Sequence, residues 1–207
     1  MKDKQIPEQK NGGLHDTENE KCFSSEIEAI DKFKILKNRF FNVNHWQSFA
    51  GDMSASFQLH DASGKTIDRP PEVGDFVEIN IPGPGNISGD GADWVKIVEV
   101  NDNPMQPEYD ERCFMRFRPS QNPTADEIED EEIAHFYSEK ASSNFLIYRK
   151  GHCVYAQIHG RNEVNNTNTD KLPDKIRNAI VGFAGRIGAG KIQWKLLTTG
   201  FLNLDEH

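Results

Sequence analysis

The sequence predicts an α+β protein in which an antiparallel β-sheet packs against a long C-terminal α-helix, with shorter helices elsewhere. Apolar side chains alternate with a period of two in several segments between residues 55 and 160, which is typical of strands. Toward the C-terminus they recur instead with the period of a helix. The 207 residues are enough for one substantial core, so we expect a single domain over residues 25–204.

The N-terminal part of the chain predicts a polar tail followed by a helix. Residues 1–24 contain few apolar side chains, so we expect them to be disordered. Ser25 is a suitable N-cap, with Glu28 three residues later, and apolar residues recur near a 3.6-residue period over 27–40. We expect the helix to break near residues 42–44.

The strands are predicted from alternation and from the turn residues between them. We expect them at residues 55–60, 76–81, 94–100 and 113–118, followed by a hairpin of 144–149 and 153–160 around Lys150-Gly151. The Pro- and Gly-rich segment 82–93 is interpreted as a surface insertion, with a mobile lid as the alternative. Residues 124–140 predict an additional helix with Thr124 as its cap and acidic residues in its first turn.

The last predicted element is a long amphipathic helix that begins after Asp170, with Pro173 near its first position. Its apolar residues keep one face from Ile176 to Phe201. Four glycines lie inside it, each costing about 1 kcal/mol relative to Ala; they are Gly182, Gly185, Gly188 and Gly190. Either they allow close approach to the sheet or a ligand, or the helix breaks at 188–190; we favour a continuous or kinked helix.

Charge and cysteine content exclude several classes of protein. The net charge of −9 opposes binding to nucleic acid, because no excess of Lys and Arg is present to neutralise phosphates. No apolar run is long enough to span a bilayer, and residues 1–10 lack the apolar segment of a signal peptide, so we expect a cytoplasmic protein. Cys22, Cys113 and Cys153 are widely spaced and odd in number, so we expect three reduced thiols.

Three motifs that suggest chemistry are incomplete. Residues 185–191 have the spacing of a phosphate-binding loop, but Ile192 replaces the Ser or Thr that would bind magnesium. Glu132 and His135 have the i, i+3 spacing of the Glu and His ligands in di-metal helical bundles, but the sequence has no second pair of this kind. Cys153 and His159 are six residues apart, about 20 Å along a strand, too far for a catalytic pair. We therefore predict no metal and no cofactor, and these motifs supply no complete catalytic set.

The order of predicted elements resembles the START-like helix-grip superfamily (SRPBCC), which includes polyketide cyclase-like and lipid-transfer proteins. The resemblance rests on Trp46-x-x-Phe49 at the end of the first helix, Val73-Gly74-Asp75 before a strand, and the C-terminal helix, and it covers residues 26–202. It implies a curved antiparallel sheet that grips the last helix and leaves a cavity for a small apolar molecule. The superfamily usually has a strand before the first helix, where only residues 21–25 are available, and the helix at 124–140 is additional.

The resemblance also implies a set of residues that line the cavity. These are Trp46, Phe57, Trp94, Phe117, Tyr155, His159, Phe183 and Ile187. The first hypothesis is a noncatalytic protein that binds a small hydrophobic or amphipathic molecule. The alternatives are a cyclase- or hydrolase-like enzyme that uses His159 or Tyr155 as acid or base, and an acidic protein-interaction module that uses the tail and the Gly-rich loop. The sequence specifies neither the ligand nor the oligomeric state.

Overall fold

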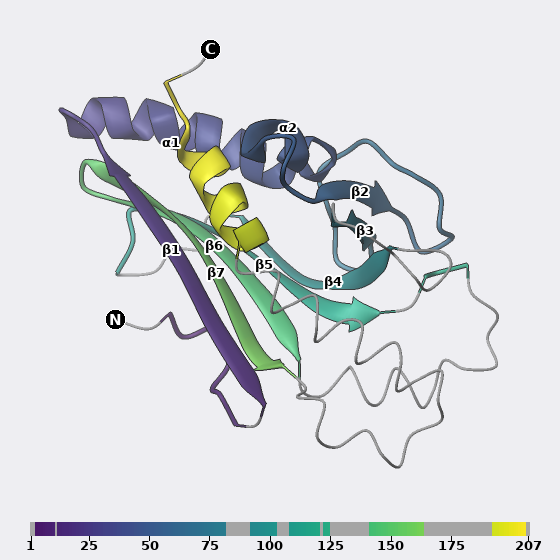
Figure 1. Cartoon of the computed structure of the whole chain (residues 1–207). Helices are drawn as coiled ribbons and strands as arrows, with labels where there is room; N and C mark the ends of the chain where they lie inside the picture. The colour runs from purple at the N-terminus through teal and green to yellow at the C-terminus, as the bar shows by residue number, and fades with distance from the viewer. Residues whose placement is uncertain are drawn as a thin grey trace.

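The computed structural model describes residues 3–10, 12–81, 92–102, 108–120, 122–124, 141–163 and 192–205. These residues form a curved, seven-stranded antiparallel sheet with strand order β1-β7-β6-β5-β4-β3-β2 (Figure 1). The elements are β1 (Gly13–Cys22), α1 (Glu26–Phe41), η1 (Val43–His45), α2 (Trp46–Ala50), β2 (Ser56–His60), β3 (Phe76–Asn80), β4 (Asp93–Asp102), β5 (Glu111–Ser120), β6 (Ser142–Lys150) and β7 (Cys153–Glu163). A helix over residues 192–202 follows. The predicted fold class is confirmed.

Helix α1 begins where the sequence predicts. The Ser25 side chain accepts a hydrogen bond from the backbone N–H of Glu28, and the Glu28 carboxylate accepts in turn from the Ser24 hydroxyl at 2.7 Å. Side chains including Phe33 and Phe40 are buried along the face of α1 that contacts the core. The expected break follows, because η1 separates α1 from α2.

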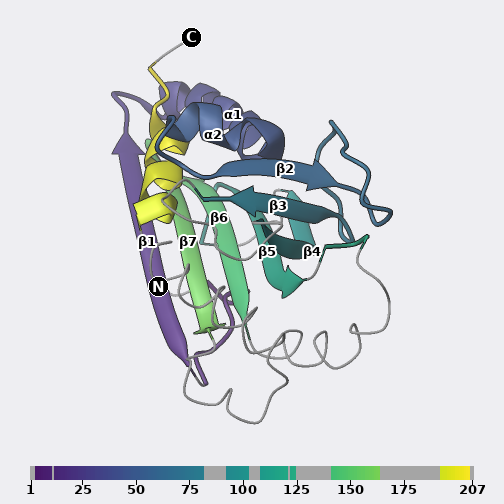
Figure 2. The same ribbon diagram turned by 45° about the vertical axis from the view of Figure 1, so that its right-hand side comes forward.

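The strands turn their apolar side chains to one face of the sheet. Phe57 and Leu59 of β2, and Val77 and Ile79 of β3, belong to the same buried core. The strand predictions and the β6–β7 hairpin are confirmed. In Figure 2 the helix over 192–202 lies on the same side of the sheet as α1 and α2. This is the concave face, and the architecture is the one that the resemblance implies.

Three polar side chains of β1 and α1 hold the C-terminal helix and the residues just after it. Asn19 of β1 donates to the Thr198 hydroxyl at 2.6 Å. Arg39 of α1 donates to the carbonyl oxygens of Gly200 and Asn203, which caps the end of the helix. Lys32 donates to the carbonyl oxygen of Leu204 at 2.7 Å. The position of the helix over the sheet is therefore specified at its C-terminal end.

Gly200 allows the C-terminal helix to approach α2 closely. A Cβ at this position would lie 2.3 Å from the carbonyl oxygen of Phe49 and 2.7 Å from the Cα of Ala50. These are backbone atoms, so the clash cannot be relieved by a change of rotamer. Close approach is the role that the sequence suggests for the four glycines between residues 182 and 190, which lie outside the described residues.

We expect Gly200→Ala to lower the free energy of unfolding by about 1–3 kcal/mol, the usual range for overpacking. The direction of the change in stability is diagnostic, because helix propensity alone favours Ala over Gly by about 1 kcal/mol and would stabilise the variant. Urea unfolding measures the difference, and Lys195→Ala at an exposed position of the same helix serves as the control. A Gly200→Ala variant as stable as the wild type would show that the helix and α2 are not in close contact.

Strand β1 corrects the prediction of a disordered tail over residues 1–24. Gly13–Cys22 pairs with β7 along its whole length, from Gly13 opposite Glu163 to Cys22 opposite Cys153. The strand is polar because it lies at the edge of the sheet, where few of its side chains are buried. Its stability comes from backbone hydrogen bonds and not from apolar burial, which is why hydrophobicity did not reveal it.

The residues before β1 also have fixed contacts, on the convex face of the sheet. The Asp3 carboxylate accepts two hydrogen bonds from the Arg112 guanidinium, at 2.8 and 3.0 Å, and both side chains are buried. Gln5 donates to Glu99 at 2.6 Å, and the Ile6 side chain is only 5% exposed. The N-terminal segment therefore covers part of the convex face.

A disulfide joins Cys22 at the end of β1 to Cys153 at the start of β7. The prediction of three reduced thiols is wrong for this pair and holds for Cys113, which is buried and forms no disulfide. The two partners are 131 residues apart in sequence, so their spacing gave no sign of the pairing. They become neighbours only through the alignment of β1 with β7.

Among the described residues, no helix is long and apolar enough to cross a bilayer.

Two predicted elements lie mainly outside the described residues. They are the Gly-rich connection, except for residues 92–93, and the helix at 124–140, of which only Thr124 is described. The predicted C-terminal helix is described only over 192–202, so its continuity through residues 188–190 remains a prediction. Two of the incomplete motifs also lie outside the described residues: the segment 185–191, which has phosphate-loop spacing, and the pair of Glu132 and His135.

Candidate binding cavity

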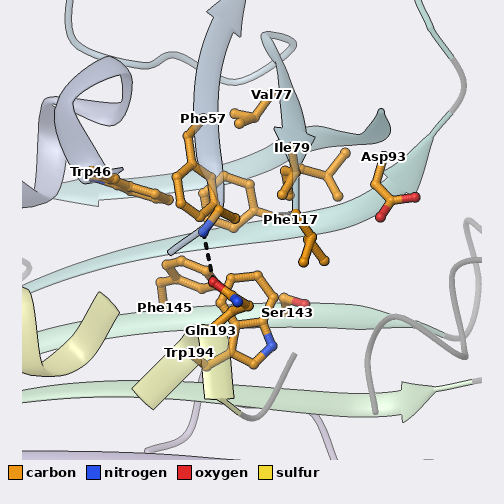
Figure 3. A pocket seen from close by; sticks show the side chains of 13 residues that line it. Trp46, Phe57, Val77, Ile79, Asp93, Phe117, Ser143, Phe145, Gln193 and Trp194 are labelled. Atoms are coloured by element: carbon orange, nitrogen blue, oxygen red, sulfur yellow. Dashed lines mark hydrogen bonds between the residues drawn. The ribbon is translucent and has the colours of Figure 1, made fainter. Parts of the chain in front are cut away.

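A cavity of about 40 Å³ lies between the concave face of the sheet and the start of the C-terminal helix (Figure 3). Its walls come from α2, from β2 to β6 and from the helix, and its lining is almost entirely apolar. The lining residues are Trp46, Ala55, Phe57, Val77, Ile79, Ile81, Asp93, Val95, Phe117, Ser143, Phe145, Gln193 and Trp194. Alternation along the strands explains the lining, since inward residues on neighbouring strands lie opposite one another.

Trp46 forms one end of the cavity. Its indole N–H donates to the carbonyl oxygens of Arg39 and Phe40, both at 3.1 Å, so the last turn of α1 fixes the ring. The ring lies 5.1 Å from that of Phe57 in an edge-to-face arrangement and 5.4 Å from that of Phe145 in a stacked one, measured between centroids. Such aromatic pairs hold one another in defined orientations. This end of the cavity is therefore rigid.

The C-terminal helix provides the opposite wall. The Gln193 side chain accepts a hydrogen bond from the Ala55 backbone N–H at 2.7 Å and donates to the Met53 carbonyl at 3.3 Å, which ties the helix to the start of β2 (Figure 3). The Trp194 ring packs edge-to-face on Phe145 at 5.5 Å. The indole nitrogen of Trp194 is buried and has no hydrogen-bond partner within the described part of the chain.

Few polar groups belong to the cavity wall. Asp93 at the start of β4 and Ser143 on β6 contribute side chains beyond the aromatic cluster, as Figure 3 shows. The Gln193 amide is already engaged with backbone groups. A cavity of this composition favours an apolar group, with a carboxylate and a hydroxyl near one end.

The structure brings three of the predicted lining residues together. Trp46, Phe57 and Phe117 all contact the cavity, and each comes from a different element. Phe183 and Ile187 lie outside the described residues, so their place on the wall remains a prediction.

Trp94 does not line the cavity. Its ring packs against the His60 ring with 4.8 Å between centroids, and its partner across the sheet is Glu78. The adjacent Val95 occupies the inward position instead. Two adjacent apolar pairs in β4, Trp94-Val95 and Ile97-Val98, hide its inward face, and a register shift between Ile97 and Glu99 changes that face within the strand.

The placement of Tyr155 and His159 on the cavity wall is also corrected. Val154, Ala156 and Ile158 of β7 are buried in the core, so the alternate residues Tyr155 and His159 point to the convex face. The Tyr155 ring stacks on that of Tyr148 at 4.4 Å there. The sequence separates the two faces of β7 correctly, but the polar face is not the one that meets the helix.

His159 belongs to a buried polar cluster on the convex face. Its Nδ1 lies 2.6 Å from an Asp16 carboxylate oxygen, and its Nε2 lies 3.0 Å from Oε1 of Gln157. Arg161 also contacts Asp16, at 2.6 Å. Burial lowers the pKa of His159, and this effect exceeds the opposing one of Asp16. Burial raises the pKa of Asp16, but hydrogen bonds from Arg161 and His159 outweigh it, so the net pKa is lowered.

The lowered pKa of His159 predicts a loss of stability in mild acid. The unfolded chain binds a proton near the ordinary pKa of 6.5, whereas the folded chain does so only at lower pH. The contribution of neutral His159 to the free energy of unfolding is therefore fully present above pH 6.5. It is lost as the pH falls from there through the pKa of His159 in the folded chain. Urea unfolding from about pH 7 to about pH 5 should show a shallower decline for His159→Gln than for the wild type. The same substitution at the exposed His45 is the matched control, and the difference between the slopes of the two variants isolates the contribution of His159.

Several lining residues were not singled out from the sequence. Phe145 is central to the aromatic cluster, and Val77, Ile79 and Val95 form the floor. Alternation in β3 placed Val77 and Ile79 on one face. Phe145 begins a run of four apolar or aromatic residues in β6, and Val95 follows Trp94 in β4, so alternation does not show which way these two face. Gln193 gave no signal, because its role depends on two backbone groups at residues 53 and 55.

Comparisons with known proteins assign no family to the chain. No protein-family model matches it, and no curated protein matches it. Solved structures that are similar include a hypothetical protein from Helicobacter pylori, with 9% identity, a TM-score of 0.45 and coverage of 91% of this chain and 88% of that one. A major latex-like protein from Panax ginseng has 13% identity, a TM-score of 0.34 and coverage of 87% and 99%. A truncated norcoclaurine synthase from Thalictrum flavum has 8% identity, a TM-score of 0.37 and coverage of 95% and 99%. None of these similarities assigns an activity to the chain.

Proposed function

We propose that this protein binds a small hydrophobic or amphipathic molecule in the cavity between the sheet and the C-terminal helix. The observation that carries the proposal is the wall of aromatic and aliphatic side chains around the 40 Å³ cavity. An empty apolar cavity lacks dispersion contacts that an apolar ligand restores, so its occupation is favourable. Asp93 and Ser143 are suited to interact with a polar end group of the ligand.

The size of the cavity limits what it accepts without rearrangement. At roughly 10–15 Å³ for each water molecule, the observed volume has room for about three. An engineered cavity that binds benzene measures about 150 Å³. We therefore propose a ligand that inserts a small apolar group, or a larger one that displaces the Trp194 ring. The Trp194 wall is the movable one, because Trp46 is held by two hydrogen bonds.

The enzymatic alternative loses the residues on which it was based. Tyr155 and His159 lie on the convex face, where they cannot reach a molecule in the cavity. Asp93 is the one titratable side chain on the described part of the wall. The interaction-module alternative also weakens, because residues 3–10 and 13–22 of the proposed binding tail are engaged within the chain itself.

A pair of matched substitutions tests the proposal by thermal shift. Ile79→Phe fills the cavity from the floor, whereas Ile67→Phe makes the same change at a partly buried position that does not line it. Benzene and indole are suitable probes. A ligand that binds the folded state alone raises its stability by RT ln(1 + [L]/Kd). We expect at least one probe to raise the Tm of wild type and Ile67→Phe, and to leave that of Ile79→Phe unchanged. Equal shifts in all three proteins would contradict the proposal.

We also propose a cellular location different from the one expected from the sequence. Disulfides persist in oxidising compartments and are rare in the reducing cytosol. The Cys22–Cys153 disulfide therefore favours an oxidising environment over the cytoplasmic location expected from the sequence. Alkylation of free thiols during cell lysis, followed by mass spectrometry, tests whether the disulfide exists in the cell.

A further inference from the structure

One group of side chains with the chemistry of metal ligands lies at the end of the β1–β7 ladder. The sulfur atoms of Cys22 and Cys153 and an imidazole nitrogen of His152 all lie within 4.8 Å of one another. Cys22 and His152 are exposed, and Cys153 is half-buried. The cavity is built from other residues, so this group is independent of the proposed function.

The backbone holds these three ligands in place on several sides. Cys22 and Cys153 are direct partners across the β1–β7 ladder. The carbonyl oxygen of His152 accepts a hydrogen bond from the Phe23 backbone N–H at 2.9 Å. Gly151, the preceding residue, donates to Asp110 at 2.7 Å and accepts from Arg149 at 2.8 Å. A rigid framework of this kind keeps ligand atoms close together whether or not the sulfurs are bonded.

We propose that reduction of the Cys22–Cys153 disulfide creates a binding site for a thiolate-preferring transition-metal ion, Zn²⁺ in the first instance, with His152 as the third ligand. A dithiol reductant supplies two electrons and two protons, which break the S–S bond and leave two thiols, while the reductant becomes a disulfide. Metal binding then releases the two thiol protons. The oxidised chain has no thiolate at this position, so the redox state decides whether the site exists.

The ligand geometry fits a tetrahedral ion with one open position. With Zn–S bonds of about 2.3 Å and a Zn–N bond of about 2.0 Å, the two sulfurs lie roughly 3.8 Å apart and each lies roughly 3.6 Å from the nitrogen. The three ligand atoms lie within 4.8 Å of one another while the two sulfurs are bonded, so reduction must be followed by rotation of the cysteine side chains that separates the sulfurs to about 3.8 Å. Two thiolates and an imidazole select Zn²⁺ over hard cations such as Mg²⁺ and Ca²⁺. Water takes the fourth position.

Titration of the full-length chain with Co²⁺ and Zn²⁺ tests the proposal. The chain is reduced, the reductant is removed under anaerobic conditions, and far-UV circular dichroism establishes that it remains folded. We expect one equivalent of Co²⁺ to give tetrahedral visible bands and sulfur-to-cobalt charge transfer, which Zn²⁺ then displaces. The oxidised chain should give neither signal.

Substitutions separate this site from adventitious binding. His152→Ala should weaken Zn²⁺ binding by roughly 100-fold or more, since loss of an outer-shell partner alone costs about 10–100-fold. His45→Ala, at an exposed histidine on η1, should leave the affinity unchanged. Cys22→Ser should abolish the charge-transfer band, and Cys113→Ala should retain it. Equal affinity in the oxidised and reduced chains, or an affinity insensitive to both His152→Ala and Cys22→Ser, would overturn the proposal.

Discussion

Loss of the Cys22–Cys153 disulfide is expected to lower the free energy of unfolding by about 2–5 kcal/mol. The disulfide closes a loop of 131 residues, for which the chain-entropy estimate is about 5 kcal/mol. Most of that effect acts on the unfolded chain, whose freedom the crosslink restricts. The bond also adds a covalent link at the end of the β1–β7 ladder, beside the backbone hydrogen bonds that hold the edge strand.

Urea unfolding with and without a reductant measures this loss, and the Cys22→Ser/Cys153→Ser double variant is the matched control. The reductant should destabilise the wild type to the level of the double variant and leave that variant unchanged. A thiol count in denaturant gives an independent check. One free thiol, that of Cys113, is expected before reduction and three after it. Three thiols before reduction would show that the disulfide is not formed.

Truncation of Trp46 to Ala is expected to lower the free energy of unfolding by about 3–5 kcal/mol. The Trp46 side chain is 1% exposed and packs against the rings of Phe57, Phe145 and Phe201. Its removal leaves a large apolar void and two carbonyl oxygens of α1 without their indole donor. Both effects weaken the junction between α1 and the sheet.

Trp94→Ala makes the same chemical change on the outer face and provides the control for Trp46. The Trp94 side chain is only partly buried, so a smaller loss is expected in the same urea experiment. Trp46→Phe should fall between the wild type and Trp46→Ala, because it keeps a ring but not the N–H donor. Equal losses from Trp46→Ala and Trp94→Ala would show that the aromatic cluster is not the centre of the core.

Local patterns were sufficient to predict much of the fold. The N-cap of α1 and the alternation in β2 and β3 are properties of consecutive residues, and the structure contains each of them. Trp46, Phe57 and Phe117 were found in the same way, because large aromatic residues on amphipathic elements usually face the core. These features need no knowledge of which strands are neighbours.

Features that depend on long-range pairing were missed. Strand β1 is polar, and only its alignment with β7 shows that it is a strand. The same alignment brings Cys22 to Cys153 and Asp16 to His159. The convex face is not simply the solvent side, because the N-terminal segment and cross-strand ion pairs bury Arg112 and His159 there. A polar face could therefore be mistaken for the lining of a cavity.

Crystals of the protein soaked in benzene provide the most direct measurement of the proposed function. We expect difference density for the ring among Phe57, Phe117, Phe145 and Trp194, with the Trp194 side chain displaced to enlarge the 40 Å³ cavity. The Ile79→Phe crystal, soaked identically, should show no density at that position. Absence of density from the wild-type cavity at saturating benzene, with the Trp194 ring in its original place, would contradict the proposal that this cavity binds apolar molecules.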